Sequence, residues 1–136
     1  SGANVYAQES AGLAGELVEL LDGADAIAAQ DTEGADRYVA ALSFPGQLLV
    51  VSARYEVPLY VDEKISNGQY REVYIDLNGA SIPDTKIQIT DIGADGLASG
   101  GTDMIDTGSG AAIFDGDAEA DAQYSRMLRA LIAAAQ

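Results

Sequence analysis

The sequence contains no histidine, no cysteine and no tryptophan, and it has only seven basic residues against twenty-two acidic ones. Without imidazole there is no Ser–His or Cys–His dyad, no histidine base at neutral pH and no histidine metal ligand. Without a thiol there is no thiolate nucleophile, no disulfide and no zinc site of the cysteine type. The available chemistry is therefore limited to carboxylates, hydroxyls, tyrosine, lysine, arginine or a bound cofactor.

The formal net charge of −15 disfavours nucleic acid and anionic lipid as partners, because binding to either depends on Lys and Arg beside phosphates. Hydrophobic residues make up 48% of the 136 residues, which is enough for a packed core in one domain. We interpret the acidity as a hydrated, salt-adapted surface, with a surface for cations or a cationic partner as the alternative. No apolar run reaches the roughly 18 residues of a transmembrane helix, so no membrane insertion is predicted.

The first residues predict export. Val5-Tyr6-Ala7 has the small-residue spacing of a signal-peptidase site, with Gln8 as the mature start. Residues 1–9 are expected to be a trimmed start, a signal-peptide remnant and disordered lead. Residues 10–136 are expected to form a single domain of a periplasmic or secreted protein.

Helical spacing of leucines after Ser10, the expected N-cap, predicts a first helix that ends or bends near Asp22-Gly23. A further short helical piece is predicted over residues 24–29. The clearest helix is at the C-terminal end, where Asp117 is the expected N-cap and Glu119 and Asp121 suit the positive end of the helix dipole. Its apolar stripe consists of Tyr124, Met127, Leu128, Leu131 and Ile132.

Between these helices the patterns are typical of strands. Residues 38–44 and 47–54 flank Pro45-Gly46, the pair that a type II turn favours, and they predict a hairpin. Residues 48–51 are apolar on both faces, which predicts a central, buried strand. Further strands are expected over residues 70–77, 86–92 and 111–114, and a short helix over residues 57–66.

Two features interrupt these patterns. Asp91 follows the inward-facing Ile87 and Ile89, which predicts a disturbed register near it. Residues 93–110 are weakly patterned and are expected to be mobile or an excursion between strands. The layout predicts an α+β fold, an antiparallel sheet or split barrel of about five to six strands flanked by an N-terminal and a C-terminal helix.

One tetrapeptide resembles a catalytic motif. Asp106-Thr107-Gly108-Ser109 matches the active-site loop of aspartic proteases, in which two such loops share a proton between paired carboxylates. A chain of this length would have to dimerise to supply the second loop. The motif lies late in the chain and is followed mostly by a helix, so the sequence favours ordinary loop composition, and a dimeric aspartic protease is a remote alternative.

Two groups of acidic residues have spacings that could suit a cation. The first alternates like the start of a calcium loop and comprises Asp115, Asp117, Glu119 and Asp121. That pattern fails where Ala120 replaces glycine and Arg126 replaces glutamate, and helix capping already accounts for these acids. The second group comprises Asp91, Asp95, Asp103 and Asp106, although Asp95-Gly96 is first a turn signal. No metal site is predicted.

Basic and tyrosine side chains gather in the middle of the sequence and form the candidate ligand-binding site, which comprises Arg54, Tyr55, Lys64, Arg71 and Tyr74. Such a cluster in an acidic protein could be an anion pocket with aromatic walls. The alternative is that each cation pairs with a carboxylate and each tyrosine packs at a strand edge. Arg126 and Arg129 are expected to make local ion pairs on the last helix.

Two blocks carry a resemblance, FPGQLLVVSARY at residues 44–55 and YREVYIDLN at residues 70–78. With FDGD at residues 114–117 and the final helix, they resemble a family of small exported bacterial proteins of unassigned function, over most of residues 24–136. The order of elements is also similar to that of flavin-binding split barrels, usually homodimers holding FMN at their interface. That likeness implies Arg54, Lys64 and Arg71 as the phosphate-binding candidates, although the family's basic pattern is not recognisable here.

The sequence therefore favours a non-enzymatic module that binds a small ligand or partner as a homodimer, without a catalytic residue or cofactor. The alternative is an FMN-binding split-barrel oxidoreductase, in which the flavin supplies the chemistry.

Overall fold

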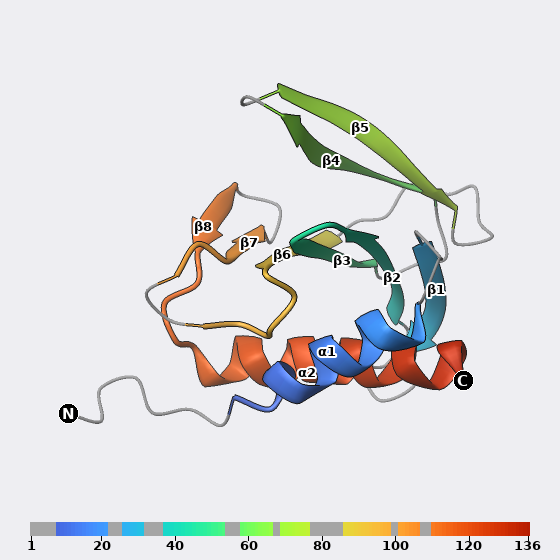
Figure 1. Cartoon of the computed structure of the whole chain (residues 1–136), viewed down its shortest axis with the longest axis vertical. Coiled ribbons are helices and arrows are strands. Elements are labelled where there is room, and N and C mark those ends of the chain that lie inside the picture. Colours follow the sequence, from blue (N-terminus) through green and yellow to red (C-terminus); the bar gives the residue numbers. More distant parts are fainter. Residues whose placement is uncertain are drawn as a thin grey trace.

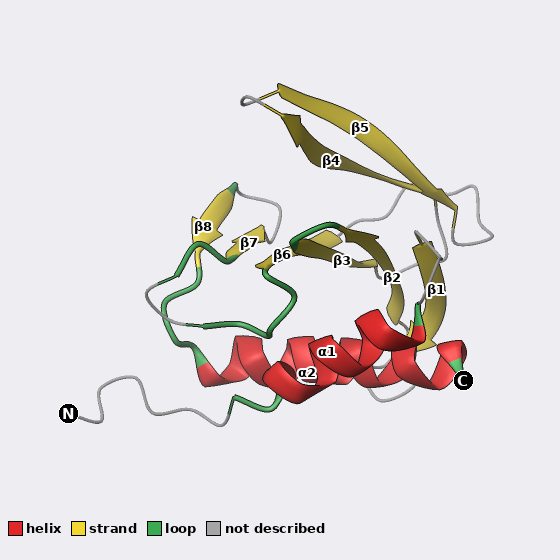
Figure 2. Ribbon diagram, viewed as in Figure 1, coloured by secondary structure: helices red, strands yellow, loops and turns green. Residues whose placement is uncertain are grey.

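In the computed structural model, the described residues contain two helices and eight strands, most of them arranged as one open sheet with both helices on one face (Figures 1 and 2). The structure describes residues 8–21, 26–31, 37–53, 58–66, 69–76, 86–98, 101–106 and 110–136. The predicted α+β class, with an antiparallel sheet between an N-terminal and a C-terminal helix, is confirmed. The expected lead, residues 1–9, lies mostly outside the described residues, and the domain boundary at residue 10 stays a prediction.

The main sheet is antiparallel throughout and has the order β1-β2-β3-β6-β7-β8. Its strands are β1 (Ala26–Asp31), β2 (Arg37–Phe44), β3 (Gln47–Ala53), β6 (Lys86–Ile92), β7 (Met104–Asp106) and β8 (Ala111–Ile113). Consecutive strands are neighbours except where a hairpin is inserted between β3 and β6. Gly46, with φ of 77°, occupies the left-handed position in the β2–β3 turn, as predicted for a type II turn.

The inserted hairpin consists of β4 (Pro58–Ser66) and β5 (Gln69–Asp76), which form a second, two-stranded sheet. Figure 1 places it on the side of the main sheet opposite the helices. The helix predicted over residues 57–66 is therefore wrong. The pair Asn67-Gly68, interpreted as a helix stop, lies outside the described residues.

The short helix predicted over residues 24–29 is also wrong, because β1 occupies this segment and pairs with β2 over six residues. Alanine favours helices, but helix propensity is a weak preference that tertiary context overrides. The backbone ladder from Ala26↔Leu42 to Asp31↔Arg37 provides that context.

Helix α2 (Ala118–Ala135) packs against β1 and β2, and α1 (Ser10–Leu20) packs against α2. Asp117 is the N-cap of α2, as predicted, and accepts a hydrogen bond from the Glu119 amide at 2.9 Å. The N-cap of α1 is Glu9 instead of the expected Ser10, which is the first helical residue. The Ser10 hydroxyl donates a hydrogen bond to Asp121 of α2 instead of capping its own helix.

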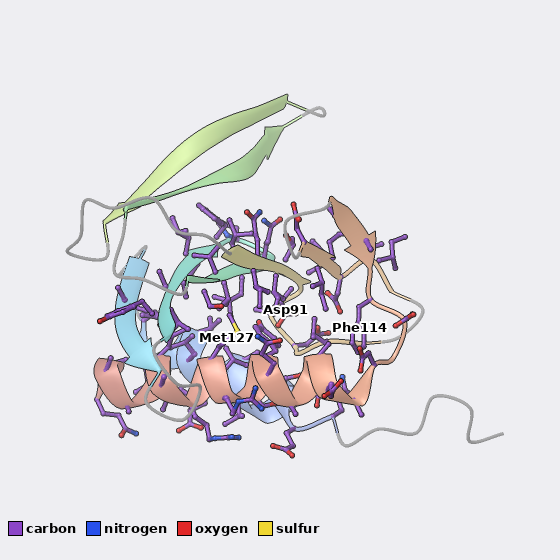
Figure 3. All side chains as sticks on the ribbon, turned by 180° about the vertical axis from the view of Figure 1, so that it is seen from behind. Asp91, Phe114 and Met127 are labelled. Atoms are coloured by element: carbon purple, nitrogen blue, oxygen red, sulfur yellow. The ribbon has the colours of Figure 1, made fainter. Side chains whose placement is uncertain are left out.

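The core lies between α2 and the sheet (Figure 3). Strand register aligns Ala41, Val50 and Ile89 across β2, β3 and β6, and all three are buried. The predicted apolar stripe of α2, from Tyr124 to Ile132, is buried against them. Leu49, on the opposite face of β3, is also fully buried, which confirms that β3 is a central strand buried on both faces.

Candidate functional site

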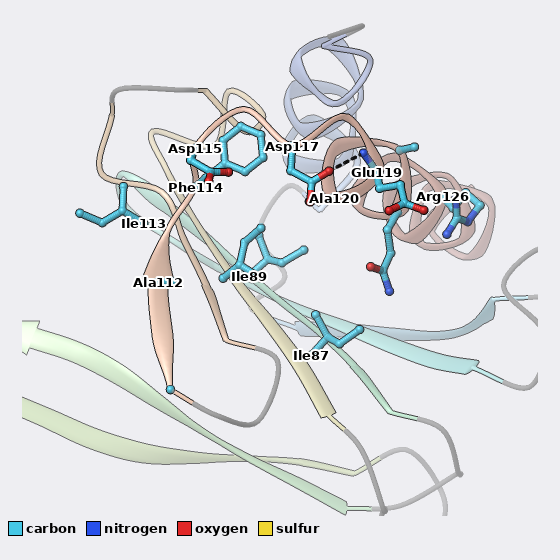
Figure 4. A pocket seen from close by; sticks show the side chains of 14 residues that line it. Ile87, Ile89, Ala112, Ile113, Phe114, Asp115, Asp117, Glu119, Ala120 and Arg126 are labelled. Carbon is cyan, nitrogen blue, oxygen red and sulfur yellow. Dashed lines mark hydrogen bonds between the residues drawn. The ribbon is translucent and has the colours of Figure 1, made fainter. Parts of the chain in front are cut away.

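A cleft of about 660 Å³ opens between the N-terminal half of α2 and the strands β6, β7 and β8 (Figure 4). Its apolar lining includes Ile87 and Ile89 of β6 and Ile105 of β7. The α2 wall includes Glu119, Gln123 and Arg126. A floor of aliphatic side chains with a few polar groups on one wall is typical of a ligand-binding site.

Local features of the chain explain why this space is open. Helix α2 packs closely on β1 and β2, at the other end of the sheet. Strands β7 and β8 have only three residues each, and β8 presents small side chains, Ala111 and Ala112. Beyond the isoleucine floor, the N-terminal half of α2 therefore faces short strands with few further side chains to fill the gap.

The charges at the cleft are separated along α2. Carboxylates gather near the start of the helix, where Asp115, Asp117 and Glu119 line the cleft. Arg126 lies two helical turns further on, about 10 Å along the helix axis from Glu119. Arg126 makes no hydrogen bond or ion pair to another described residue, so its guanidinium is available on that wall. The cleft thus has an acidic end and a single cation at some distance from it.

Asp91 lies outside the cleft, in the core beneath the Tyr124 side chain of α2. Its carboxylate accepts hydrogen bonds from the Tyr124 hydroxyl at 2.7 Å, the Gly96 amide at 2.9 Å and the Asp95 amide at 3.2 Å. Burial raises the pKa of Asp91 to about 6, although these hydrogen bonds lower it, and the nearby Asp103 raises it further. All of its bonds are internal to the fold, which indicates a structural role.

The predicted disturbance of register near Asp91 is wrong, because β6 pairs with β3 without a break as far as Ile92↔Gln47. Asp91 follows the same alternation as Ile87 and Ile89, and the polar side chain that suggested a bulge is buried facing the helices.

Asp103 performs a similar role on the loop between β6 and β7. It accepts hydrogen bonds from the Ile92 amide at 2.8 Å and the Ala98 amide at 2.9 Å, and burial raises its pKa. The described part of this excursion is therefore held by two carboxylates. Asp106 accepts from the Gly110 amide at 3.3 Å instead. Among the described residues, no group of three or more potential ligands is arranged to hold a metal ion.

Asp121 joins the two helices and the same loop. It is fully buried and accepts hydrogen bonds from the Ser10 hydroxyl at 2.5 Å and the Glu9 amide at 3.1 Å, so a residue of α2 caps α1. Ser10 in turn accepts from the Leu97 amide at 3.0 Å. Asp121 does lie in the first turn of α2, as expected, but the sequence gives no signal of its capping role in α1.

None of the ligand-binding residues predicted from the sequence is among the described residues that line this cleft. Arg54 and Tyr55 lie outside the described residues, and so do Thr107, Gly108 and Ser109 of the protease-like motif. Lys64, Arg71 and Tyr74 lie on the β4–β5 hairpin, where the backbone register pairs them with Tyr70, Glu63 and Tyr60 in that order. The proposed anion pocket, FMN binding and the protease alternative therefore stay predictions.

The two arginines of α2 differ from expectation. Arg129 forms an ion pair at 3.3 Å with Glu9, which precedes α1, so this pair joins distant parts of the chain and is not local. Arg126 contributes to the cleft. Sequence reasoning missed the cleft because Ile87, Ile89 and Ile105 look like ordinary core residues. Ile89 is buried, and the half-buried state of Ile87 and Ile105 follows from where α2 crosses the sheet.

Comparisons with family models, with curated proteins and with solved structures gave no match to this chain. Within the described residues, no helix has the length and apolar character needed to cross a membrane.

Proposed function

We propose that this domain is a non-enzymatic binding module whose cleft between α2 and β6–β8 takes a ligand with an aliphatic body and a cationic group. The observation that carries the proposal is the placement of an isoleucine floor, Ile87, Ile89 and Ile105, beside the carboxylates at the start of α2. An aliphatic chain gains about 0.8 kcal/mol for each methylene that it buries there.

Charge supplies selectivity. Asp115 and Glu119 are exposed, and exposed ion pairs contribute at most about 1 kcal/mol. The affinity therefore comes mainly from the apolar floor, while the carboxylates favour a positively charged ligand over a negatively charged one. The net charge of −15 adds long-range attraction for cations and raises their rate of association.

The positions of the perturbed ionisable groups favour binding over catalysis. Catalytic acids and bases are usually groups with shifted pKa values inside a cleft. Here burial raises the pKa values of Asp91, Asp103 and Tyr124, but none of the three lines the cleft and each is hydrogen-bonded within the fold or coupled to a neighbouring carboxylate.

The test is a calorimetric and NMR titration with n-octylammonium and with n-octanoate, both below their micelle concentrations. We expect octylammonium to bind several-fold more tightly, because its head group meets carboxylates. Ala122→Trp should block binding by filling the cleft, whereas Ala133→Trp, exposed on the same helix, should not.

A second pair of variants separates local from global charge. Glu119→Gln should weaken octylammonium binding, whereas Glu16→Gln, which removes the same charge from an exposed position of α1, should leave it nearly unchanged. Equal binding of the two amphiphiles, or binding that persists in Ala122→Trp, would contradict the proposal.

A further inference from the structure

Along one side of the cleft, strand β8 has backbone hydrogen-bonding groups that face no other described strand. The Phe114 amide, next after β8, donates to the Asp103 carbonyl at 2.9 Å, toward β7. Backbone groups of alternate residues point to opposite sides of an antiparallel strand. Ala112 therefore also bonds toward β7, and the N–H and C=O groups of Ala111 and Ile113 point away from it. Among the described strands, β8 is the last of the sheet, so none covers these groups.

This edge lacks the usual protection against further pairing. Edge strands commonly carry a lysine, a proline or a bulge that hinders another strand. All three residues of β8 are exposed and uncharged, and Ile113 is 62% exposed. The two alanines leave the backbone accessible.

The edge and the cleft share one row of residues. Register aligns Ala112 with Ile105 and Ile105 with Ile89, and all three line the cleft. In a further strand beside β8, the residue opposite Ala112 would project on the same side of the sheet as Ala112. That side chain would lie at the mouth of the cleft. The side chain two residues further along the added strand would lie near the carboxylates that follow β8.

We propose that the partner is an extended peptide segment that binds as a seventh strand along β8. It places an aliphatic residue opposite Ala112 and a lysine or arginine two residues away, toward Asp115 and Glu119. This inference rests on the proposed function of the cleft and adds the form of the ligand. Charge complementarity favours a basic segment of another protein over a second copy of this chain, because each copy carries −15 and the same carboxylates.

The probe is the acetylated and amidated peptide Thr-Leu-Thr-Lys-Thr, titrated by NMR and compared with the version in which glutamate replaces lysine. The lysine peptide should bind more tightly and shift the amide signals of β8. Two N-methylated versions of the lysine peptide test whether its backbone forms hydrogen bonds with β8. One is methylated at the amide nitrogen of the middle threonine, and the other at the amide nitrogens of leucine and lysine. In an added strand, only alternate N–H groups point toward β8. One of the two methylated peptides should therefore lose binding and the other should keep it. Equal binding by the two versions would overturn the inference.

A protein variant separates this inference from the proposed function. Ile113→Pro removes an outward N–H without removing a bond to β7, and prolines are tolerated on strand edges in this way. It should weaken peptide binding about tenfold while octylammonium still binds. Ile113→Val keeps the N–H and should retain peptide binding.

The outcomes are distinct. Octylammonium binding with peptide binding that is insensitive to Ile113→Pro overturns strand addition alone. If octylammonium binds no better than octanoate, and the lysine peptide no better than the glutamate peptide, the proposed function is overturned as well. A wild-type dimer that Ile113→Pro dissociates, measured by sedimentation, would make the second copy the occupant and overturn the choice of partner.

Discussion

The hydroxyl of Tyr124 donates a hydrogen bond of 2.7 Å to the Oδ2 atom of Asp91, and this contact joins the middle of α2 to the end of β6 inside the core. Both residues are fully buried. Asp91 also holds the Asp95 and Gly96 amides. One polar contact therefore connects the helix, the sheet and the β6–β7 loop. Burial raises the pKa values of both side chains. Because neither group is in contact with water, the hydrogen bond between them replaces hydration that each would otherwise have.

Tyr124→Phe should lower the free energy of unfolding by about 1–3 kcal/mol, because it leaves a buried carboxylate with one donor fewer. It should also raise the pKa of Asp91 further, since the lost hydrogen bond lowers it. Urea unfolding at pH 8 measures the first effect. Tyr38→Phe on β2 is the control, because no hydrogen bond from that side chain occurs among the described contacts, and equal losses in the two variants would contradict the assignment.

Stability should decrease as the pH rises from about 4 to about 6, with Asp91 as one cause. Its pKa is about 6 in the folded chain against an ordinary 3.8, so in this range the folded state keeps a proton that the unfolded state has released. The difference corresponds to at most about 3 kcal/mol. In Asp91→Asn this part of the pH dependence should disappear, whereas Glu16→Gln should retain it. Urea unfolding at several pH values gives the slopes, and identical slopes for wild type and Asp91→Asn would refute the prediction.

Gly96→Ala should destabilise the protein by more than about 2 kcal/mol, because two penalties coincide. The residue has φ of 89°, and a Cβ placed there would lie 2.5 Å from the Ala11 nitrogen and 2.6 Å from its Cα. Gly46→Ala is the matched control, since Gly46 has φ of 77° with open space around it and should cost only about 1 kcal/mol. Thermal unfolding of the two variants decides whether the close approach of loop and α1 matters.

Asp121→Ala should cost more stability than Asp117→Ala, although both residues cap a helix. Asp117 is exposed and its loss should cost about 1 kcal/mol, typical of an N-cap. Loss of Asp121 leaves the buried Ser10 hydroxyl without its acceptor, at about 1–3 kcal/mol, and it removes the acceptor of the Glu9 amide as well. Urea unfolding measures both, and the reverse order would show that α1 does not depend on this contact.

Alanine at Gly12 or Gly15 should stabilise the protein by about 0.5–1 kcal/mol each, because both glycines lie inside α1. A Cβ at either position meets nothing within 4 Å. A higher midpoint of thermal unfolding in each variant is the expected result. A lower one would indicate that α1 is not helical at these positions.

Local features that the sequence contains in full were predicted correctly. Pro45-Gly46 specifies its turn through backbone conformation, and the α2 stripe with its Asp117 cap specifies a helix through periodicity. Residues 48–51 predicted a buried central strand because both of their faces are apolar. In each case the deciding interactions involve residues close together in the chain or the hydrophobicity of a single segment.

The tertiary structure decided the features that need a distant partner. The alanine-rich segment of β1 forms a strand because β2 is beside it, and Asp91 belongs in the core because Tyr124 meets it there. The cleft arises from where α2 crosses the sheet, and Arg126 belongs to it only through that crossing. The missing histidine and cysteine and the surplus of carboxylates limit the chemistry from the sequence alone. Which carboxylates are buried and which face the cleft depends on long-range packing, because burial is a property of the folded chain.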